Sequence, residues 1–425
     1  MLTERIETVI IGGGQAGLTI SHCLTRLKRP HIVLERHRIA ERWRTERWDS
    51  LRFQFPNWSM RLPDFPYAGN DPDSYAPRDD VVRFIEAYAA FIQAPVRTGV
   101  EVRALRRAPD GFSLETGGSA IQARNVVIAT GPYQRPAIPP AAAGLERVVQ
   151  MSASDYRNPG QAPTGGVLVV GAGASGCQIA EELMRAGRTV FLSVGPHRRV
   201  PRRYRDRDII WWITELGMDD AIADEEAARK PPLLISGAYG GQTIDLRRYA
   251  AHGMVLLGRF QDARDGIVSF APDLEQTLAA GDDSFAGFIA AADAHVARAG
   301  LALPRESIAV LESAPVAEPT LSVDLRVAGI ETVIWATGYR YDFGWVDLDI
   351  FTPAGAPVHR RGVTDVPGVY FLGLPFLHKT KSSFMSGVGE DAAYLAEQIA
   401  ARSSAALECW PALFHERLAR FLGIV

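Results

Sequence analysis

The sequence predicts an α/β protein that contains two dinucleotide-binding, Rossmann-like domains. Two glycine-rich turns have the GxGxxG spacing, and each follows an apolar strand and precedes a helical stretch. Two further apolar strands end in Ala-Thr-Gly, and each lies downstream of one of these turns. A single GxGxxG is weak evidence because glycines also serve ordinary turns, whereas two in this context predict two bound dinucleotides.

The first unit has the order strand, glycine turn, helix and second strand, over residues 7–11, 12–17, 18–27 and 31–35. Gly12, Gly14 and Gly17 allow the backbone to approach a pyrophosphate, whose charge the amides at the helix N-terminus offset. Glu35 follows Gly17 by 18 positions, which is near the spacing of a carboxylate that binds a ribose diol. The alternative for Glu35 is an exposed turn residue.

The second unit repeats this order over residues 167–170, 171–176, 177–186 and 189–194, with its glycines at Gly171, Gly173 and Gly176. Ser193 stands where the first unit has Glu35, and a hydroxyl does not repel a 2′-phosphate as a carboxylate does. Arg198 and Arg199 follow, and an arginine pair near the ribose favours NADPH over NADH. The alternative is a solvated basic face, because Asp206 and Asp208 come next.

The strands that end in Ala-Thr-Gly cover residues 125–131 and 331–338. Small residues at the end of a buried strand indicate a backbone that passes close to another group, although a plain strand and turn would look the same. Proline- and glycine-rich stretches around 132–144 and 157–166 are typical of connections between lobes. Amphipathic patterns predict further helices over 79–92, 387–402 and 410–422.

An aromatic and arginine-rich stretch over residues 41–52 is too polar for a core and too aromatic for an ordinary loop. Its Arg42 and Trp43 are suited to the wall of a flat cofactor ring, which needs apolar faces and a few hydrogen-bonding groups. Gln54 and Asn57 follow, and we take them as candidate catalytic residues that could bind the ring edge or an oxygen adduct. Either could instead be an ordinary loop amide.

The composition narrows the function. Lys and Arg (46) nearly balance Asp and Glu (49), for a net charge of −3, so no affinity for nucleic acid or anionic membrane is indicated. Cys23, Cys177 and Cys409 lie far apart with no CxxC, which argues against a disulfide scaffold, a zinc site and a redox dithiol. The first residues do not resemble a signal peptide, and no apolar run is long enough to span a membrane. We expect a cytoplasmic protein and no metal.

Taken together, these motifs resemble the flavin-containing monooxygenase-like flavoproteins of the class B monooxygenase superfamily, and in particular their bacterial CzcO-like branch. The segments that carry the resemblance are residues 12–17, 41–44 with 48–51, 129–133, 169–176, 335–339 and 387–392. The resemblance implies FAD and NADPH as cofactors, with the NADPH domain inserted into a discontinuous FAD domain. The expected divisions are an FAD part over 1–159, an NADPH domain over 160–325, and a second FAD part over 326–425.

The candidate cofactor residues follow from the motifs and the resemblance together. Those for FAD are Gly12, Gly14, Gln15, Ala16, Gly17, Glu35, Arg36, Arg42, Trp43 and Thr130. Those for NADPH are Gly171, Gly173, Ser175, Gly176, Ser193, Arg198 and Arg199.

The activity implied by the resemblance is an FAD-dependent, NADPH-consuming monooxygenase. It would act through a flavin C4a-(hydro)peroxide on a small organic substrate, by N- or S-oxygenation or a Baeyer–Villiger reaction. The chain departs from the monooxygenase fingerprint, since Ser152 stands at its histidine position and only the final aromatic, Tyr156, is kept. This departure supports the alternative of an NAD(P)H-dependent flavoprotein oxidase or reductase that inserts no oxygen. A nucleotide-sensing regulatory protein ranks last.

The expected partners are a small-molecule substrate and molecular oxygen, without nucleic acid or membrane. A homodimer is one option for the assembly, which the sequence leaves open.

Overall fold

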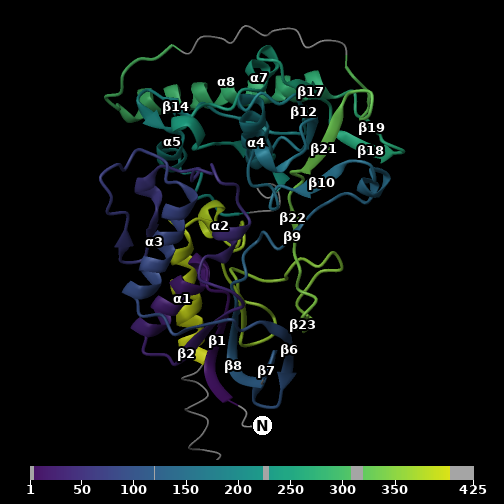
Figure 1. The fold of residues 1–425 in the computed structure, drawn as a ribbon. Coiled ribbons are helices and arrows are strands. Elements are labelled where there is room, and N and C mark those ends of the chain that lie inside the picture. The colour runs from purple at the N-terminus through teal and green to yellow at the C-terminus, as the bar shows by residue number, and fades with distance from the viewer. Residues whose placement is uncertain (1–3, 119, 224–228, 308–318, 403–425) are drawn as a thin grey trace, which may run out of the picture.

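A computed structural model describes residues 4–118, 120–223, 229–307 and 319–402, which form two lobes drawn one above the other in Figure 1. Each predicted dinucleotide unit forms the centre of one lobe, which confirms the α/β class with two such domains. The C-terminal helix expected over 410–422 lies outside the described residues.

The first lobe is built on an eight-stranded sheet in the order β23-β6-β7-β8-β1-β2-β5, with β24 also paired to β8. These strands are β1 (Glu4–Ile11), β2 (His31–Glu35), β5 (Val96–Thr98), β6 (Val102–Ala108), β7 (Gly111–Thr116), β8 (Ala120–Ile128), β23 (Val346–Asp347) and β24 (Val369–Phe371). Its helices are α1 (Gln15–Arg26), α2 (Glu41–Thr45), α3 (Arg78–Phe91) and a helix over 388–402, with the small hairpin β3 (Arg61–Leu62) and β4 (Phe65–Pro66).

The second lobe is built on a five-stranded parallel sheet in the order β10-β21-β11-β12-β17. These strands are β10 (Val149–Ser152), β11 (Gly166–Val170), β12 (Val190–Ser193), β17 (Val255–Leu257) and β21 (Ile330–Trp335). Its helices are α4 (Ala174–Arg185), α5 (Ile209–Glu215), α7 (Leu246–Ala251) and α8 (Leu274–Ala299). Smaller sheets are β13 (Arg198–Arg199) with β16 (Leu233–Leu234), β14 (Arg203–Tyr204) with β15 (Arg207–Asp208), and β18 (Phe260–Arg264), β19 (Ile267–Phe270) and β20 (Ser322–Asp324).

The chain crosses between the lobes twice, and the two crossings pair with each other. They form an antiparallel ribbon of β9 (Arg135–Pro136) and β22 (Tyr339–Arg340), which lies between the lobes in Figure 1. The second sheet includes β10 and β21, which lie outside the expected range 160–325. The reason is that β21, the second strand ending in Ala-Thr-Gly, pairs with β11, the strand before the second glycine turn. β10 in turn pairs with β21, so both strands belong to this sheet. We propose boundaries near residues 148 and 336.

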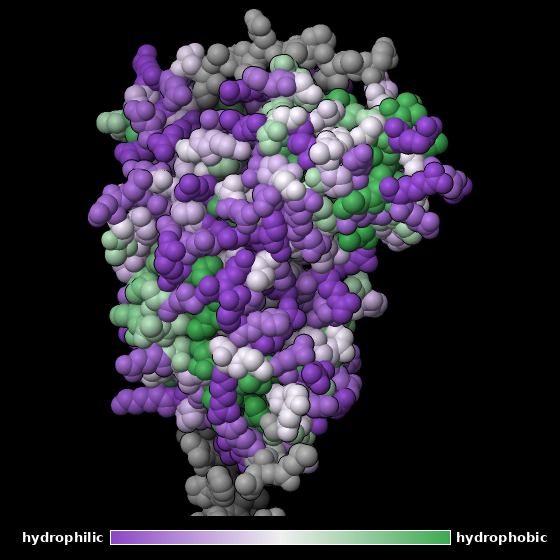
Figure 2. Space-filling view, in the orientation of Figure 1, coloured by the Kyte–Doolittle hydropathy of each residue, from purple (hydrophilic) through white to green (hydrophobic). Residues whose placement is uncertain are grey.

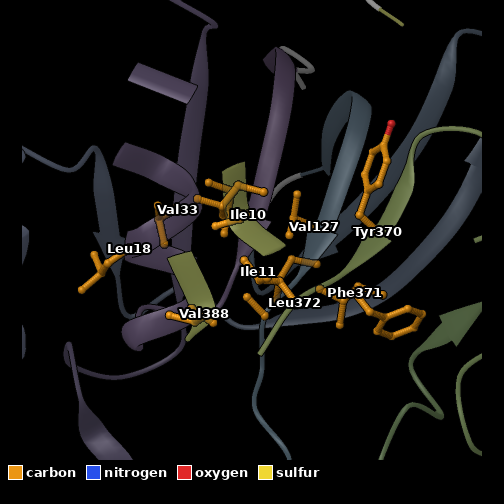
Figure 3. Close-up of a cluster of buried hydrophobic side chains, with 14 of the residues drawn as sticks. Ile10, Ile11, Leu18, Val33, Val127, Tyr370, Phe371, Leu372 and Val388 are labelled. Carbon is orange, nitrogen blue, oxygen red and sulfur yellow. The ribbon is translucent and has the colours of Figure 1, made fainter. Parts of the chain in front are cut away.

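The core of the first lobe lies around the C-terminal halves of its central parallel strands. β1 pairs in parallel with β2 on one side and β8 on the other, and its last four residues, over 8–11, are buried. Ile10, Val33 and Val127 are fully buried, with Leu18 of α1 and Val388 packed against them (Figure 3). Burial of this kind contributes about 1.5–3 kcal/mol for each large aliphatic side chain, and it fixes the start of α1 against the sheet.

The surface in Figure 2 is mainly hydrophilic, with hydrophobic residues gathered at the upper right, in the region of β18 and β19. Ile267, Leu321 and Val327 are exposed in this part of the chain. Among the described residues, no helix has both the length and the apolar character needed to cross a membrane.

Candidate functional site

The first glycine turn is shaped by contacts within the protein. Gly12 has φ +116°, and a Cβ there would lie 2.5 Å from the carbonyl oxygen of Ala129. A Cβ on Gly17 would overlap the carbonyl oxygen of Gly12. Gly14 differs, because it immediately precedes α1 and a Cβ there would meet nothing within 4 Å. The turn therefore leaves open space in front of a helix N-terminus, whose free amides favour an anion.

The second glycine turn repeats this geometry. Gly171 has φ +106°, and a Cβ there would lie 2.6 Å from the carbonyl oxygen of Ala336. A Cβ on Gly176 would overlap the carbonyl oxygen of Gly171, whereas one on Gly173 would meet nothing within 4 Å. Ala129 and Ala336 begin the two Ala-Thr-Gly segments, so the close neighbour of each segment is the first glycine of the adjacent turn. The two lobes thus present matching open cradles.

Glu35 lies at the carboxyl end of β2, beside the first turn. Its Oε2 accepts a hydrogen bond from the amide of Gly13 at 2.7 Å, and its Oε1 accepts one from the amide of His37 at 2.9 Å. The carboxylate is half-buried and held in place, and its remaining lone pairs can accept bonds from ribose hydroxyls. Arg36 is exposed next to it.

Residues distant in sequence contact the start of α1, next to the first cradle. The side-chain amide of Gln15 donates to the carbonyl of Ser383 at 2.7 Å, just before the helix over 388–402. The loop at Gly373 passes close to the buried Ala16, because a Cβ on this glycine would lie 2.6 Å from that of Ala16. The hydroxyl of Thr130 accepts a bond from Gln134 at 3.1 Å.

The aromatic and arginine-rich segment packs at the same end of the lobe. Trp43 is half-buried, with its ring 6.1 Å from that of Phe53 and the guanidinium of Arg47 5.6 Å from its ring centre. Arg42 is bonded to Glu46 at 2.6 Å and to the carbonyl of Tyr133. The segment therefore brings aromatic rings and arginine side chains together at this end of the lobe.

The two candidate catalytic amides have different environments. Asn57 is 5% exposed, and its Nδ2 donates to the carbonyl of Asp71 at 2.9 Å. Its Oδ1 is buried and has no hydrogen-bond partner among the described residues, which leaves an acceptor that a ligand can satisfy. Gln54 is half-buried, and its backbone carbonyl accepts a bond from Arg202 of the other lobe at 2.7 Å.

The candidate NADPH residues are only partly brought together. Ser175 is exposed in the first turn of α4. Ser193 is buried, and its hydroxyl donates to the carbonyl of Gly258 at 2.9 Å and accepts from the amide of Phe260 at 3.0 Å. Its hydroxyl therefore binds the backbone of the segment that follows β17.

The two arginines after β12 point to different partners. Arg199 is 6% exposed and lies between Asp245, at 3.2 Å, and Asp282, at 2.6 Å. A guanidinium with two carboxylates is already neutralised and has little attraction left for a phosphate. Arg198 is half-buried, and within the described part of the chain its side chain is bonded through Nε to the carbonyl of Pro231 at 2.8 Å. Arg198 is the better candidate of the pair.

A buried contact between the lobes is one feature that the sequence did not reveal. The Nη2 of Arg202 donates to the carboxylate of Asp208 at 2.9 Å, and its Nε donates to the hydroxyl of Tyr75 at 3.0 Å. Tyr75 donates to Asp208 at 2.6 Å, and its ring centre lies 4.3 Å from the guanidinium. The only sequence signal was the basic run around Arg202, because Tyr75 is 127 positions away.

A second contact joins the lobes near the helix over 388–402. Lys379 is bonded to Asp220 and to Glu390, at 2.8 Å each. Lys381 is also paired with both carboxylates, and the two lysines lower the pKa of Asp220 to about 2. In the sequence, the residues around Lys379 look like the polar residues of an exposed loop. In the structure they form ion pairs between the lobes.

At the fingerprint position, Ser152 ends β10 and is 2% exposed. Its hydroxyl donates to Asp155 at 2.7 Å, and the hydroxyl of Tyr156 donates to Glu182 of α4 at 2.8 Å. The bond of Ser152 therefore closes a local turn, and that of Tyr156 ties the segment after β10 to α4.

Comparisons with known proteins agree with this arrangement. The chain matches the family described as pyridine nucleotide-disulphide oxidoreductase over residues 9–214. A protein of Geobacillus kaustophilus described as an uncharacterized CzcO-like oxidoreductase is 33% identical over 399 residues, which cover 93% of this chain and 98% of that protein. Indole-3-pyruvate monooxygenase YUCCA1 of Oryza sativa subsp. japonica is 34% identical over 195 residues, or 43% of this chain and 48% of that protein.

Among solved structures, a flavin-containing monooxygenase from Stenotrophomonas maltophilia is similar, with a TM-score of 0.65. The two share 19% identity, and the match covers 94% of this chain and 100% of that one. At this level of identity the similarity shows a common fold.

Proposed function

We propose that this chain, which belongs to the CzcO-like oxidoreductases and matches the pyridine nucleotide-disulphide oxidoreductase family over residues 9–214, is an NADPH-consuming monooxygenase of small organic molecules. The observation that carries the proposal is the pair of matching open cradles, one in each lobe. Two cradles in one chain suit an enzyme that moves electrons from one dinucleotide to another.

The first cradle fits FAD. The space in front of Gly14 is suited to a pyrophosphate, and Glu35 is placed to accept the ribose hydroxyls. The orphaned Oδ1 of Asn57 and the half-buried ring of Trp43 offer a hydrogen bond and an apolar wall to a flavin ring. When bound, FAD supplies the redox chemistry, namely hydride acceptance from NADPH and activation of molecular oxygen.

The second cradle fits the pyrophosphate of NADPH in front of Gly173. We propose that Arg198 recognises the 2′-phosphate, because Arg199 is occupied by two carboxylates. The names of two relatives support oxygen insertion as the outcome, since one is an indole-3-pyruvate monooxygenase and the other a flavin-containing monooxygenase.

The binding step is tested by a matched pair of substitutions. Neither Gly14→Ala nor Gly173→Ala meets any protein atom within 4 Å, so both variants should fold like the parent chain. If a pyrophosphate lies in front of each glycine, Gly14→Ala weakens FAD binding and leaves NADP⁺ binding unchanged, whereas Gly173→Ala does the reverse. Equal binding of both dinucleotides by both variants would contradict the proposal.

The reaction is tested by labelling. The protein is incubated with NADPH and ¹⁸O₂ in the presence of thioanisole, N,N-dimethylaniline or cyclohexanone, and the products are analysed by mass spectrometry. A monooxygenase places one labelled oxygen atom in the product. Hydrogen peroxide formed in amounts equal to the NADPH consumed, without labelled product, would favour the alternative.

The alternative is a flavoprotein oxidase or reductase that inserts no oxygen. It is favoured by Ser152 at the fingerprint histidine position, where a short hydroxyl tied to Asp155 replaces a ring. The labelling experiment distinguishes it, because NADPH would still be consumed while the organic compound would contain no labelled oxygen.

A further inference from the structure

A cleft of about 430 Å³ lies between the lobes, outside the residues assigned to either dinucleotide. Its walls come from the loops over 49–52 and 74–77 of the first lobe and the loop over 237–240 of the second. The loops over 49–52 and 74–77 flank the segment that carries Gln54 and Asn57. A volume of this size is within the usual range for a small-molecule site.

The cleft contains one cationic side chain without an ion-pair partner among the described residues. Arg52 lines it with an exposed side chain, and its bond to the carbonyl of Tyr75 is long, at 3.5 Å. Among the described residues, no carboxylate forms an ion pair with Arg52. Asp49, the acidic residue that lines the cleft, is already bonded to Arg78 at 3.2 Å and to Asn158 at 2.8 Å. The guanidinium of Arg52 is thus left for an external anion.

The cleft also contains two tyrosines in fixed positions. The hydroxyl of Tyr75 is held by Asp208 and Arg202, as described above. Tyr239 is 42% exposed, and the guanidinium of Arg185 lies 3.9 Å from its ring centre. Tyr239 therefore offers a partly exposed ring in the same cleft that Arg52 lines.

The backbone at Tyr239 is strained. Its φ is +52° and its ψ +38°, a left-handed conformation that is unfavourable for a residue with a Cβ. The neighbouring Gly237 fixes this turn against the other lobe, because a Cβ there would overlap the carbonyl oxygen of Phe53. Strain maintained by tight packing is found most often at ligand sites.

We propose that this cleft binds a small planar carboxylate, with the carboxylate on Arg52 and the ring against Tyr239. The inference rests on the proposed function and deepens it, because it names aromatic acids as the substrate class. An arginine matches a carboxylate with two parallel hydrogen bonds, which a neutral amide of the same shape cannot reproduce.

The test is a binding measurement that needs no turnover. Benzoate and 2-naphthoate are titrated into the oxidised, flavin-loaded protein by calorimetry, each against its own amide, benzamide or 2-naphthamide. We expect the acids to bind about ten- to a hundredfold more tightly than the amides, which corresponds to one charge-assisted interaction. Arg52→Met should remove this preference without changing the affinity for the amides.

Arg61→Met is the matched control. Arg61 is exposed, has no ion pair among the described residues and does not line the cleft, so its replacement should leave acid binding unchanged. Equal affinity for acid and amide, equal effects of the two variants, or loss of acid binding at saturating NADP⁺ would each overturn the inference. The proposed function fails separately, if the protein binds the acids but never places labelled oxygen in a product.

Discussion

Replacement of Arg202 tests whether the buried contact between the lobes stabilises the protein. In Arg202→Met the carboxylate of Asp208, whose side chain is 9% exposed, loses its cationic partner. Removal of one partner from a buried ion pair costs about 3–5 kcal/mol. Asp208 keeps its bonds from the hydroxyl of Tyr75 at 2.6 Å and the amide of Ile210 at 2.8 Å, so we expect the low end, about 3 kcal/mol.

The measurement is urea unfolding followed by circular dichroism, and the neighbouring residue supplies the control. Arg203 is exposed, and its Nη2 is 3.4 Å from the carbonyl of Asp73, so Arg203→Met should change the free energy of unfolding by no more than about 0.5 kcal/mol. The double variant Arg202→Met/Asp208→Asn should be more stable than Arg202→Met alone, because an amide leaves no unpaired charge. If Arg202→Met were as stable as Arg203→Met, the reasoning would be refuted.

Three further predictions follow from the cradles and the buried histidines. Gly17→Ala should reduce stability as well as flavin content, because its Cβ would overlap the carbonyl oxygen of Gly12, whereas Gly14→Ala should weaken FAD binding without a loss of stability. Normal stability of Gly17→Ala in thermal unfolding would contradict this. Glu35→Gln should raise the dissociation constant of FAD about tenfold, since a neutral amide is a weaker acceptor for two hydroxyls; fluorescence titration of the apoprotein with FAD measures it, and an unchanged constant would remove Glu35 from the site.

The last of these concerns pH. Burial lowers the pKa of the histidines at 31, 197 and 359, so the unfolded chain takes up protons near pH 6.5 that the folded chain does not. Stability should therefore be full above about pH 6.5 and fall as the pH decreases, by at most about 1.4 kcal/mol per pH unit for each histidine. Urea midpoints at pH 7.5, 6.5 and 5.5 measure this, and a flat profile would contradict it.

The four helices that the sequence predicted within the described residues are found close to their expected bounds because their signals are local, whereas α5, α7 and the long α8 were not predicted. α3 runs over Arg78–Phe91 against an expected 79–92, and the last described helix begins at residue 388 rather than 387. α1 and α4 begin at Gln15 and Ala174, three residues before their expected starts, because the glycine turn passes into the helix without an intervening loop. The spacing of apolar residues locates a helix in the sequence. The residue at which the helix begins depends on backbone geometry, which that spacing does not show.

The sequence by itself determined the two dinucleotide units, because strand, glycine turn and helix are consecutive and their physical requirements are local. It also placed Glu35 at the end of its strand, where the structure finds it beside Gly13. Only the tertiary structure decided which side chains are available to a ligand. Arg199 is neutralised by Asp245 and Asp282, and Arg202 is bonded to Tyr75, through contacts between residues 46 to 127 positions apart. The charge of a residue, read from the sequence, shows what kind of group it can bind. The tertiary structure decides whether another residue of the protein already occupies it.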